Sequence, residues 1–346
     1  MRFLLDDEQR AFARSLNALL TAADTPSVIR SWAAGDHSAG RALWSRIADA
    51  GVFALAVPEA YDGVGPLPVE LTVAFVELGR HAVPGPLVET VAAASLLTDP
   101  GPAKRLLPGL ASGETIATVA LPTGAGAAGP GGGPHAGERA LDGDTATVRL
   151  TVDGDALRLA PGHGPVHASI DPARRLTALD RGGELLASGP HVAAAAEEAL
   201  TRARLATAAQ ALGTGLALLD KTVAYVKQRA QFGVPIGSFQ AVKHQLADAK
   251  TALEFARPLL FGAALSLRPA DVAAAKVAAC EAAYATARTA LQLHGAIGYT
   301  AEYDLSLWLT KARALRTAWG TPHACRTLVL SVPGGLGGLS GGARRS

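Results

Sequence analysis

The stretch RAQFGVPIGSFQAVKHQLAD, residues 229–248, places a tight turn rich in Gly and Pro between two segments whose apolar residues recur at helical spacing. A basic residue and an aromatic residue flank this turn. The guanidinium of Arg229 can make two parallel hydrogen bonds to a pyrophosphate, and Phe232 can pack against a ring. A helix-capping arginine and a core phenylalanine are commoner roles for these residue types, and periodicity alone does not choose between the two interpretations.

Helical patterns continue from this stretch in both directions, back to residue 192 and forward towards the C-terminus. They predict long helices over residues 192–228, 238–265, 270–293 and 303–317. Thr321 followed by Pro322 is typical of an N-cap and first-turn pair, which predicts one further helix. Four long helices with short connections are expected to pack as a bundle.

Composition divides the whole chain into helical, mixed and helical thirds. Short strands are predicted where β-branched residues run or alternate between glycines, at residues 115–121, 145–152 and 156–160. The sequence therefore predicts a mainly α protein with a small β domain. Its expected parts are an N-terminal helical domain (1–112), a shortened central β domain (113–190), a C-terminal four-helix bundle (191–331) and a flexible Gly-rich tail (332–346).

Size and charge exclude several classes of protein. The 346 residues are 49% hydrophobic, which is enough to bury a core and excludes a disordered chain. The net charge is +2 and no basic run is longer than the two residues of a pair such as the closing Arg344-Arg345, so we expect no nucleic-acid partner. Cys280 and Cys325 cannot build a disulfide framework, and neither a signal peptide nor a membrane span is recognisable. We therefore expect a cytoplasmic protein without a membrane partner.

Familiar cofactor and metal motifs give no assignment. The sequence GAGAAG (124–129) has the spacing of a dinucleotide fingerprint, but the PGGGP that follows cannot begin the helix which such a site requires. His163 and His167 have the spacing of helical zinc ligands, yet Gly and Pro around them oppose a helix. Both segments are better interpreted as loops, and we expect no metal site.

Four segments, in this order, resemble the acyl-CoA dehydrogenase family over essentially the whole chain. They are LAVPEAYDGVG (55–65), the RAQFGVPIGSFQ that begins at residue 229, QLHGAIGYTAEY (292–303) and WGTP (319–322). The resemblance implies FAD and an acyl-CoA thioester at the junction of the three domains, in tetramers that bind FAD across a subunit interface. It assigns cofactor binding to Arg229, Phe232, Gln240, Gln292, Gly295 and Thr321.

The reaction of that family needs a carboxylate that removes the proton α to the thioester while a hydride passes to the flavin. The resemblance implies that this base stands before the Gly-Thr of the last helix or on the first bundle helix. Here these positions carry Trp319 and Ala203, so no catalytic residue is assigned. Trp319 either fills the space of an acyl chain or is an ordinary core residue. Glu197 and Glu198 point away from the Ala203 face at about 100° per residue, and we expect them at the surface.

A second departure from the family lies in the central domain. LPTGAGAA (121–128) keeps the glycines of the family's flavin-holding segment but lacks its acid and its closing Ser-Asp, and residues 113–190 contain no Trp. In addition, RHAVPGPLVET (80–90) and DPARRLTALD (171–180) resemble the short subunits of heterotetrameric acyl-CoA dehydrogenases that break down steroid side chains in actinobacteria.

The resemblance therefore implies a subunit that is inactive alone and completes the FAD site of a longer, homologous, Glu-bearing partner. The complex would desaturate an acyl-CoA. Two alternatives remain open at this point. One is a self-sufficient flavoenzyme of the same fold with other chemistry, such as oxygen activation by reduced flavin, and the other is a flavin-free structural subunit.

Overall fold

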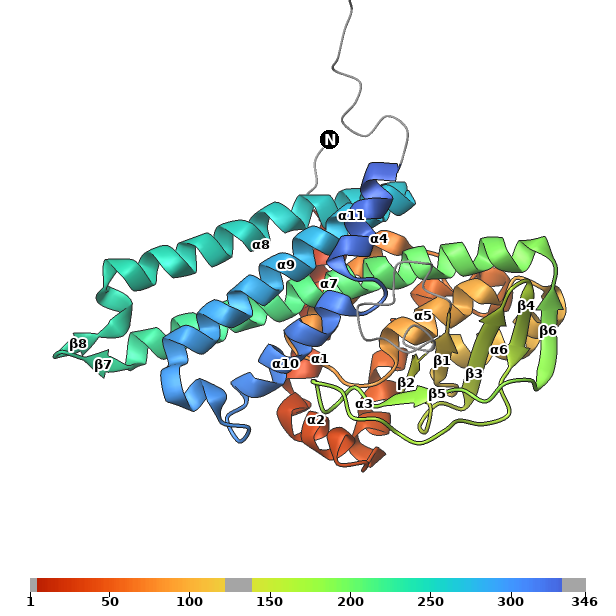
Figure 1. Cartoon of the computed structure of the whole chain (residues 1–346), viewed down its shortest axis with the longest axis horizontal. Coiled ribbons are helices and arrows are strands. Elements are labelled where there is room, and N and C mark those ends of the chain that lie inside the picture. Colours follow the sequence, from red (N-terminus) through yellow and green to blue (C-terminus); the bar gives the residue numbers. More distant parts are fainter. Residues whose placement is uncertain (1–4, 122–138, 332–346) are drawn as a thin grey trace, which may run out of the picture.

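The computed structural model describes residues 5–121 and 139–331, so GAGAAG and the Gly-rich tail lie outside the described residues. Figure 1 shows the N-terminal helices and a small β region around one end of a long helix, from which the remaining helices extend. This mainly helical architecture with a small β region confirms the predicted fold class. None of the helices within the described ranges is long and apolar enough to cross a membrane.

Six helices make up the N-terminal part. They are α1 (Asp7–Thr21), α2 (Thr25–Ala33), α3 (Ser38–Asp49), α4 (Pro68–Arg80), α5 (Leu87–Leu96) and α6 (Pro100–Ala111), with short 3-10 turns at η1 (Ala54–Ala56) and η2 (Glu59–Tyr61). Helix α1 begins at a capping box formed by Asp6 and Gln9, which satisfies two backbone N–H groups. Helix α5 packs against strand β1 (Ala117–Ala120) and against the bundle, so nearly all of its residues are buried.

The central part contains β1, β2 (Arg139–Leu141), β3 (Val148–Asp153), β4 (Ala156–Leu159), β5 (Leu176–Ala178) and β6 (Glu184–Ser188). One sheet has the order β1-β3-β4-β6, in which only the β1–β3 pair is parallel, and β2 pairs with β5. The three predicted strands correspond to β1, β3 and β4. Strands β2 and β5 were not predicted, because three residues are too few to show an alternating pattern, and β6 was missed as well.

The C-terminal part is built on α7 (Pro190–Gln228), a helix of 39 residues. It continues with the hairpin β7 (Ala230–Gln231) and β8 (Val234–Pro235), η3 (Ile236–Ser238), α8 (Gln240–Ser266), α9 (Pro269–His294), η4 (Gly295–Tyr299), α10 (Leu305–Thr317) and α11 (Pro322–Ser331). The predicted helices agree with α7 to α10 to within a few residues. The Thr321 hydroxyl accepts a hydrogen bond from the Ala324 N–H at 3.2 Å, which confirms the predicted N-cap.

The two histidines with zinc-ligand spacing lie in irregular, non-helical backbone. His163 bridges to Leu179 and His167 to Leu176, both in an antiparallel sense. Their side chains therefore do not share a helical face, as the surrounding Gly and Pro residues led us to expect.

Candidate functional site

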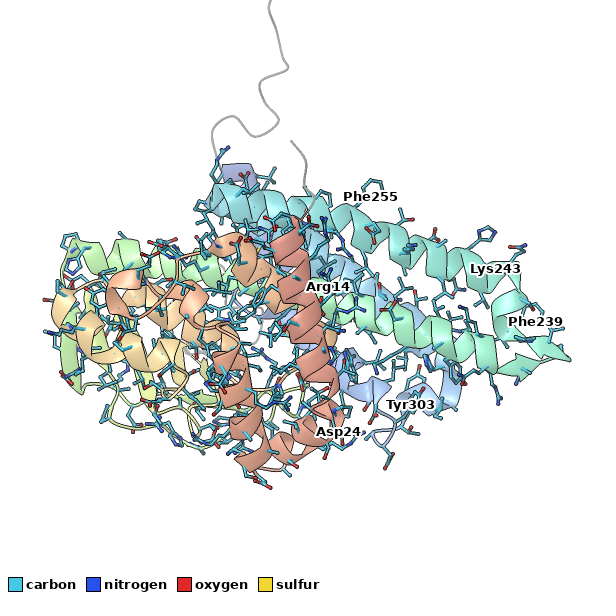
Figure 2. All side chains as sticks on the ribbon, turned by 180° about the vertical axis from the view of Figure 1, so that it is seen from behind. Arg14, Asp24, Phe239, Lys243, Phe255 and Tyr303 are labelled. Carbon is cyan, nitrogen blue, oxygen red and sulfur yellow. The ribbon has the colours of Figure 1, made fainter. Side chains whose placement is uncertain are left out.

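The far end of the bundle brings together segments that are distant in the sequence. The Tyr225 ring, one turn before the hairpin, stacks on His294 with 4.1 Å between ring centroids, and its hydroxyl donates to the His294 carbonyl oxygen at 3.3 Å. This contact holds the end of α7 against the end of α9. In Figure 2, Phe239 and Lys243 mark the same end, well away from the N-terminal helices.

The β7–β8 hairpin projects beyond the bundle and carries an exposed aromatic side chain. Phe232 is 90% exposed, with its backbone in the left-handed region at φ +54°, and its ring meets Phe239 edge-on at 6.3 Å. The alternative of a core phenylalanine is therefore wrong for this residue. Arg229 caps α7 through its backbone N–H, which donates to the Tyr225 carbonyl oxygen at 2.9 Å, while its side chain stays exposed.

Five of the six residues to which the resemblance assigns cofactor binding lie at this end. Gln240 begins α8 and Gln292 ends on the last turn of α9, and both are exposed. Gly295 has φ +64°, and a Cβ placed on it would meet nothing within 4 Å. We call this set the distal cluster: Arg229, Phe232, Gln240, Gln292 and Gly295.

Thr321, the sixth of these residues, lies elsewhere. Its loop is held by Arg204 of α7, whose Nε donates to the Trp319 carbonyl oxygen at 3.1 Å. Arg204 and Arg229 are roughly 25 residues apart on one helix, which corresponds to about 37 Å at 1.5 Å per residue. The distal cluster and the Thr321 loop are therefore separate regions of this chain.

The Thr321 loop borders a cavity of about 630 Å³, which we call the central cavity. Strands β1, β2 and β5 supply one side of it, and α10 with the loop to α11 supplies another. Its charged and hydrogen-bonding side chains are Glu89, Arg139, Ser169, Arg174, Tyr284, Arg313, Arg316, Thr317, Trp319 and Thr321, and the rest of its lining is mostly aliphatic.

Trp319, one of the two positions at which the resemblance places the base, lines this cavity. Its backbone is left-handed at φ +58°, and Lys276 fixes the next residue by donating from Nζ to the Gly320 carbonyl oxygen at 2.7 Å. The side chain is partly buried and packs against the main core. Trp319 is thus not a fully enclosed core residue, and its side chain forms part of the wall of the cavity.

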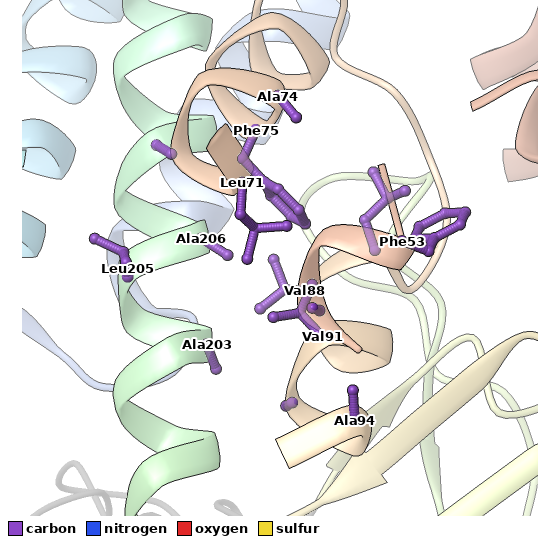
Figure 3. Close-up of a cluster of buried hydrophobic side chains, with 14 of the residues drawn as sticks. Phe53, Leu71, Ala74, Phe75, Val88, Val91, Ala94, Ala203, Leu205 and Ala206 are labelled. Carbon is purple, nitrogen blue, oxygen red and sulfur yellow. The ribbon is translucent and has the colours of Figure 1, made fainter. Parts of the chain in front are cut away.

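Ala203, the other position at which the resemblance places the base, is fully buried. Figure 3 shows its side chain pointing from α7 towards Val91 of α5, inside the core that α4, α5 and α7 share. Glu197 and Glu198 are exposed, and Glu198 pairs with Arg202 at 2.7 Å. Their expected place at the surface is confirmed.

Glu89 is an acid in the central cavity that the sequence analysis missed. Its side chain comes from α5, is 3% exposed, and leaves Oε2 without a hydrogen-bond partner among the described residues. Burial raises the pKa of Glu89, while Arg174 and a hydrogen bond from the Trp319 side chain act in the opposite direction. A lone Glu inside the apolar run LVETVAAASL was the available signal, because a buried acid in such a helix needs a reason.

A second buried acid stands behind the cavity. Asp142 accepts a hydrogen bond from Trp32 Nε1 at 3.2 Å. Burial raises its pKa to about 8, and the nearby Glu89 adds to the shift. Lys311, which is also buried, lies 3.8 Å from Asp171 and donates to the Val83 carbonyl oxygen. These groups connect the N-terminal helices, the β region and α10 beneath the cavity.

Comparisons with known families cover most of the chain. Residues 6–114 match the acyl-CoA dehydrogenase N-terminal domain, and residues 193–331 match the acyl-CoA dehydrogenase C-terminal domain. Acyl-CoA dehydrogenase IpdE2 of Mycobacterium tuberculosis (strain ATCC 25618 / H37Rv) is 32% identical over 310 residues, which are 88% of this chain and 91% of that protein.

Two solved structures of complexes are also similar. The ChsE4-ChsE5 complex from Mycobacterium tuberculosis gives a TM-score of 0.79 at 26% identity, with 96% of this chain and 100% of that chain covered. The Tcur3481-Tcur3483 steroid ACAD G363A variant gives 0.75 at 26% identity, with 93% and 96% covered. Sequence, fold and motif positions agree, and this chain belongs to the acyl-CoA dehydrogenase family.

Proposed function

We propose that this chain is the subunit without a catalytic base in a heteromeric acyl-CoA dehydrogenase, and that its distal cluster completes the FAD site of a partner subunit. FAD is the cofactor of this family. The observation that carries the proposal is the exposed distal cluster, in which Arg229 lies about 37 Å along α7 from Arg204, the residue that holds the loop bordering the chain's own central cavity. An FAD molecule held by the distal cluster is therefore expected to serve the active site of another chain.

The chemistry of the distal cluster suits the adenosine diphosphate part of FAD. Arg229 offers a guanidinium for a pyrophosphate, and Gln240 and Gln292 offer amide donors and acceptors. The open space at Gly295 allows close approach of a ligand to the backbone. Phe232 presents a large apolar ring that no described residue covers apart from the edge of Phe239. Such a ring is stabilised when a partner or a ligand buries it.

The partner is proposed to supply the carboxylate that this chain lacks. In the family reaction FAD accepts a hydride, and a protein carboxylate takes the proton α to the thioester carbonyl. Ala203 is enclosed by core residues and Trp319 carries no acid, so neither position in this chain provides such a group. We infer a heterotetramer with a longer, Glu-bearing homologue, acting on an acyl-CoA with a bulky, steroid-like acyl group. Relatives named as a steroid ACAD and as the ChsE4-ChsE5 complex support this inference.

The test is co-expression with such a homologue, followed by measurement of flavin absorbance and native mass. We expect a yellow complex, whereas the chain purified alone is colourless. In the complex, Arg229→Gln and Phe232→Ala should each lower the bound flavin at least about tenfold, equivalent to about 1.4 kcal/mol, without changing the native mass. Arg14→Gln, at an exposed position on α1 (Figure 2), is the matched control and should retain full flavin. A yellow, active homotetramer of this chain alone would overturn the proposal.

One observation favours a second candidate function. Glu89 places a carboxyl group in the chain's own central cavity, and a self-sufficient flavoenzyme would use such a group as its acid or base. In that case the chain alone binds FAD, and Glu89→Gln lowers turnover while flavin content stays constant. Oxygen uptake that depends on reduced flavin but not on acyl-CoA would identify the oxygen-activating form of this candidate.

A further inference from the structure

The central cavity has an unusual balance of charge. Its described lining contains four guanidinium groups but one carboxyl group, that of Glu89. One of the four, Arg316, is already paired with Glu281 at 2.9 Å and lies over the Tyr284 ring. The remaining arginines come from three different segments, β2, the loop before β5 and α10, and border the same space: Arg139, Arg174 and Arg313. The cavity therefore favours an anion.

The uncharged part of the lining is aliphatic. Val119, Leu121 and Leu141 line it from the strands, Ile170 and Leu176 from the segment around β5, and Ala314 from α10. About 630 Å³ is within the range of pockets that enclose a small organic molecule. The arrangement suits a ligand with an apolar body and one anionic end, rather than a hydrated inorganic ion.

Glu89 adds a second, independent sign of a ligand. Its Oε2 is buried and has no hydrogen-bond partner in the part of the chain that the structure describes, and an unsatisfied buried polar atom is costly. The groups that act on it are Arg174, Lys311, Asp142 and the Trp319 side chain. Burial raises the pKa of Glu89 and so favours its protonated form, and a protonated carboxyl group can donate a hydrogen bond.

We propose that the central cavity is a non-catalytic binding site for an apolar organic carboxylate, whose anionic end lies between Arg174 and Arg313 and accepts a hydrogen bond from Glu89. The site is distinct from the distal cluster, and its non-catalytic character rests on the proposed function. Free carboxylic acids and the acyl ends of thioesters both bring an apolar body, but only the free acid brings the carboxylate at its end. Hydrogen bonds between an arginine and a carboxylate are short, planar and charge-assisted. The two arginines therefore distinguish a free carboxylic acid from the acyl end of a thioester.

The experiment is calorimetric titration of the full chain with decanoate, decanamide, decanoyl-CoA and FAD as separate probes. Decanoate is expected to bind, and decanamide, which has the same apolar body without the charge, is expected to bind at least about tenfold more weakly. Equal binding of decanoate and decanamide would overturn the proposal, since it would show that only the apolar chain contributes to binding. Binding of FAD or decanoyl-CoA without binding of decanoate would also overturn it and would assign the cavity to the reaction.

Variants test the individual contacts. Arg174→Gln and Arg313→Gln should each weaken decanoate binding about tenfold, whereas Arg326→Gln, an exposed arginine on α11 outside the cavity lining, should not change it. Glu89→Gln should retain binding because an amide also donates, and Glu89→Leu should weaken it. Should Glu89→Leu fail to fold, the two arginine variants still decide the outcome, because both side chains reach solvent.

The pH dependence provides a further readout. Wild-type affinity should fall as the pH is raised, because ionisation of Glu89 removes its donor and adds a charge that repels the carboxylate. Glu89→Gln should show a flatter profile over the same range. Identical pH profiles for the two proteins would contradict a direct contact between Glu89 and the ligand.

Discussion

Asp142 shows how a single buried acid sets the pH dependence of stability. It is fully buried, and its Oδ2 has no partner among the described residues. Burial raises its pKa from 3.8 to about 8. The unfolded chain therefore loses this proton near pH 4, while the folded chain keeps it up to about pH 8. The stability that the protonated group provides is complete below about pH 4 and is lost progressively as the pH rises to about 8.

Asp142→Asn should stabilise the protein at neutral and alkaline pH. The amide keeps an oxygen for the Trp32 N–H and never ionises, so the variant avoids the loss described above. We expect its melting temperature to exceed that of the wild type by a margin that grows from pH 5 to pH 8, reaching at least about 2–4 °C, or about 1 kcal/mol. Asp153→Asn, at an exposed strand end, is the control without such a margin. A margin that does not change with pH would contradict this account.

Residues of the candidate site differ in how far the sequence could predict them. The motif around Arg229 and Phe232 was visible, but the choice between a core and an exposed Phe232 depended on how far the hairpin extends beyond the bundle. Glu89 was hidden in an apolar helix, and its relation to Trp319 arises from packing between segments that are 230 positions apart. Spacing along one helix cannot predict such a contact.

At the scale of elements, the crossing of α4 and α7 depends on two glycines. A Cβ on Gly213 would lie 1.9 Å from the Val76 carbonyl oxygen, and one on Gly79 would lie 2.1 Å from the Gln210 carbonyl oxygen. The helix backbones are therefore too close for any side chain at these positions. Thr214 bridges the same crossing by donating to the Gly79 carbonyl oxygen at 3.2 Å.

Gly213→Ala should destabilise the protein because the two helices must move apart. Overpacking of this kind costs about 1–3 kcal/mol, and we expect a matching fall in melting temperature together with a lower denaturant midpoint. Gly101→Ala on α6 is the control, since its Cβ meets nothing within 4 Å and alanine favours helix. A Gly213→Ala protein as stable as the wild type would show that the crossing tolerates a side chain.

Elements were predicted well where patterns are long and poorly where they are short. The bundle helices follow from more than twenty residues of continuous helical spacing in each of the longest cases, which local preference and burial both support. Strands β2 and β5 are three residues each and exist because they pair with one another, so their formation depends on tertiary context.

At the scale of the whole molecule, hydrogen exchange in residues 229–239, which contain the β7–β8 hairpin, should report assembly. This segment is exposed along most of its length and shares few hydrogen bonds with the rest of the bundle. We expect its amide hydrogens to exchange rapidly in the chain alone and to become protected when the complex with a Glu-bearing homologue forms, as measured by mass spectrometry. Amides of α5, which is buried already, serve as the internal reference. An unprotected hairpin in a yellow complex would exclude it from the interface.

The length of α7 allows its two ends to evolve independently. Substitutions near Trp319 and Glu89 can accumulate without disturbing the region around Arg229, because a rigid helix transmits position but few individual contacts over that span. Under the proposed function, the cavity end of α7 lacks a catalytic base of its own while the Arg229 end serves a partner subunit. Such a division of roles between two subunits requires only that α7 remain a straight, continuous helix.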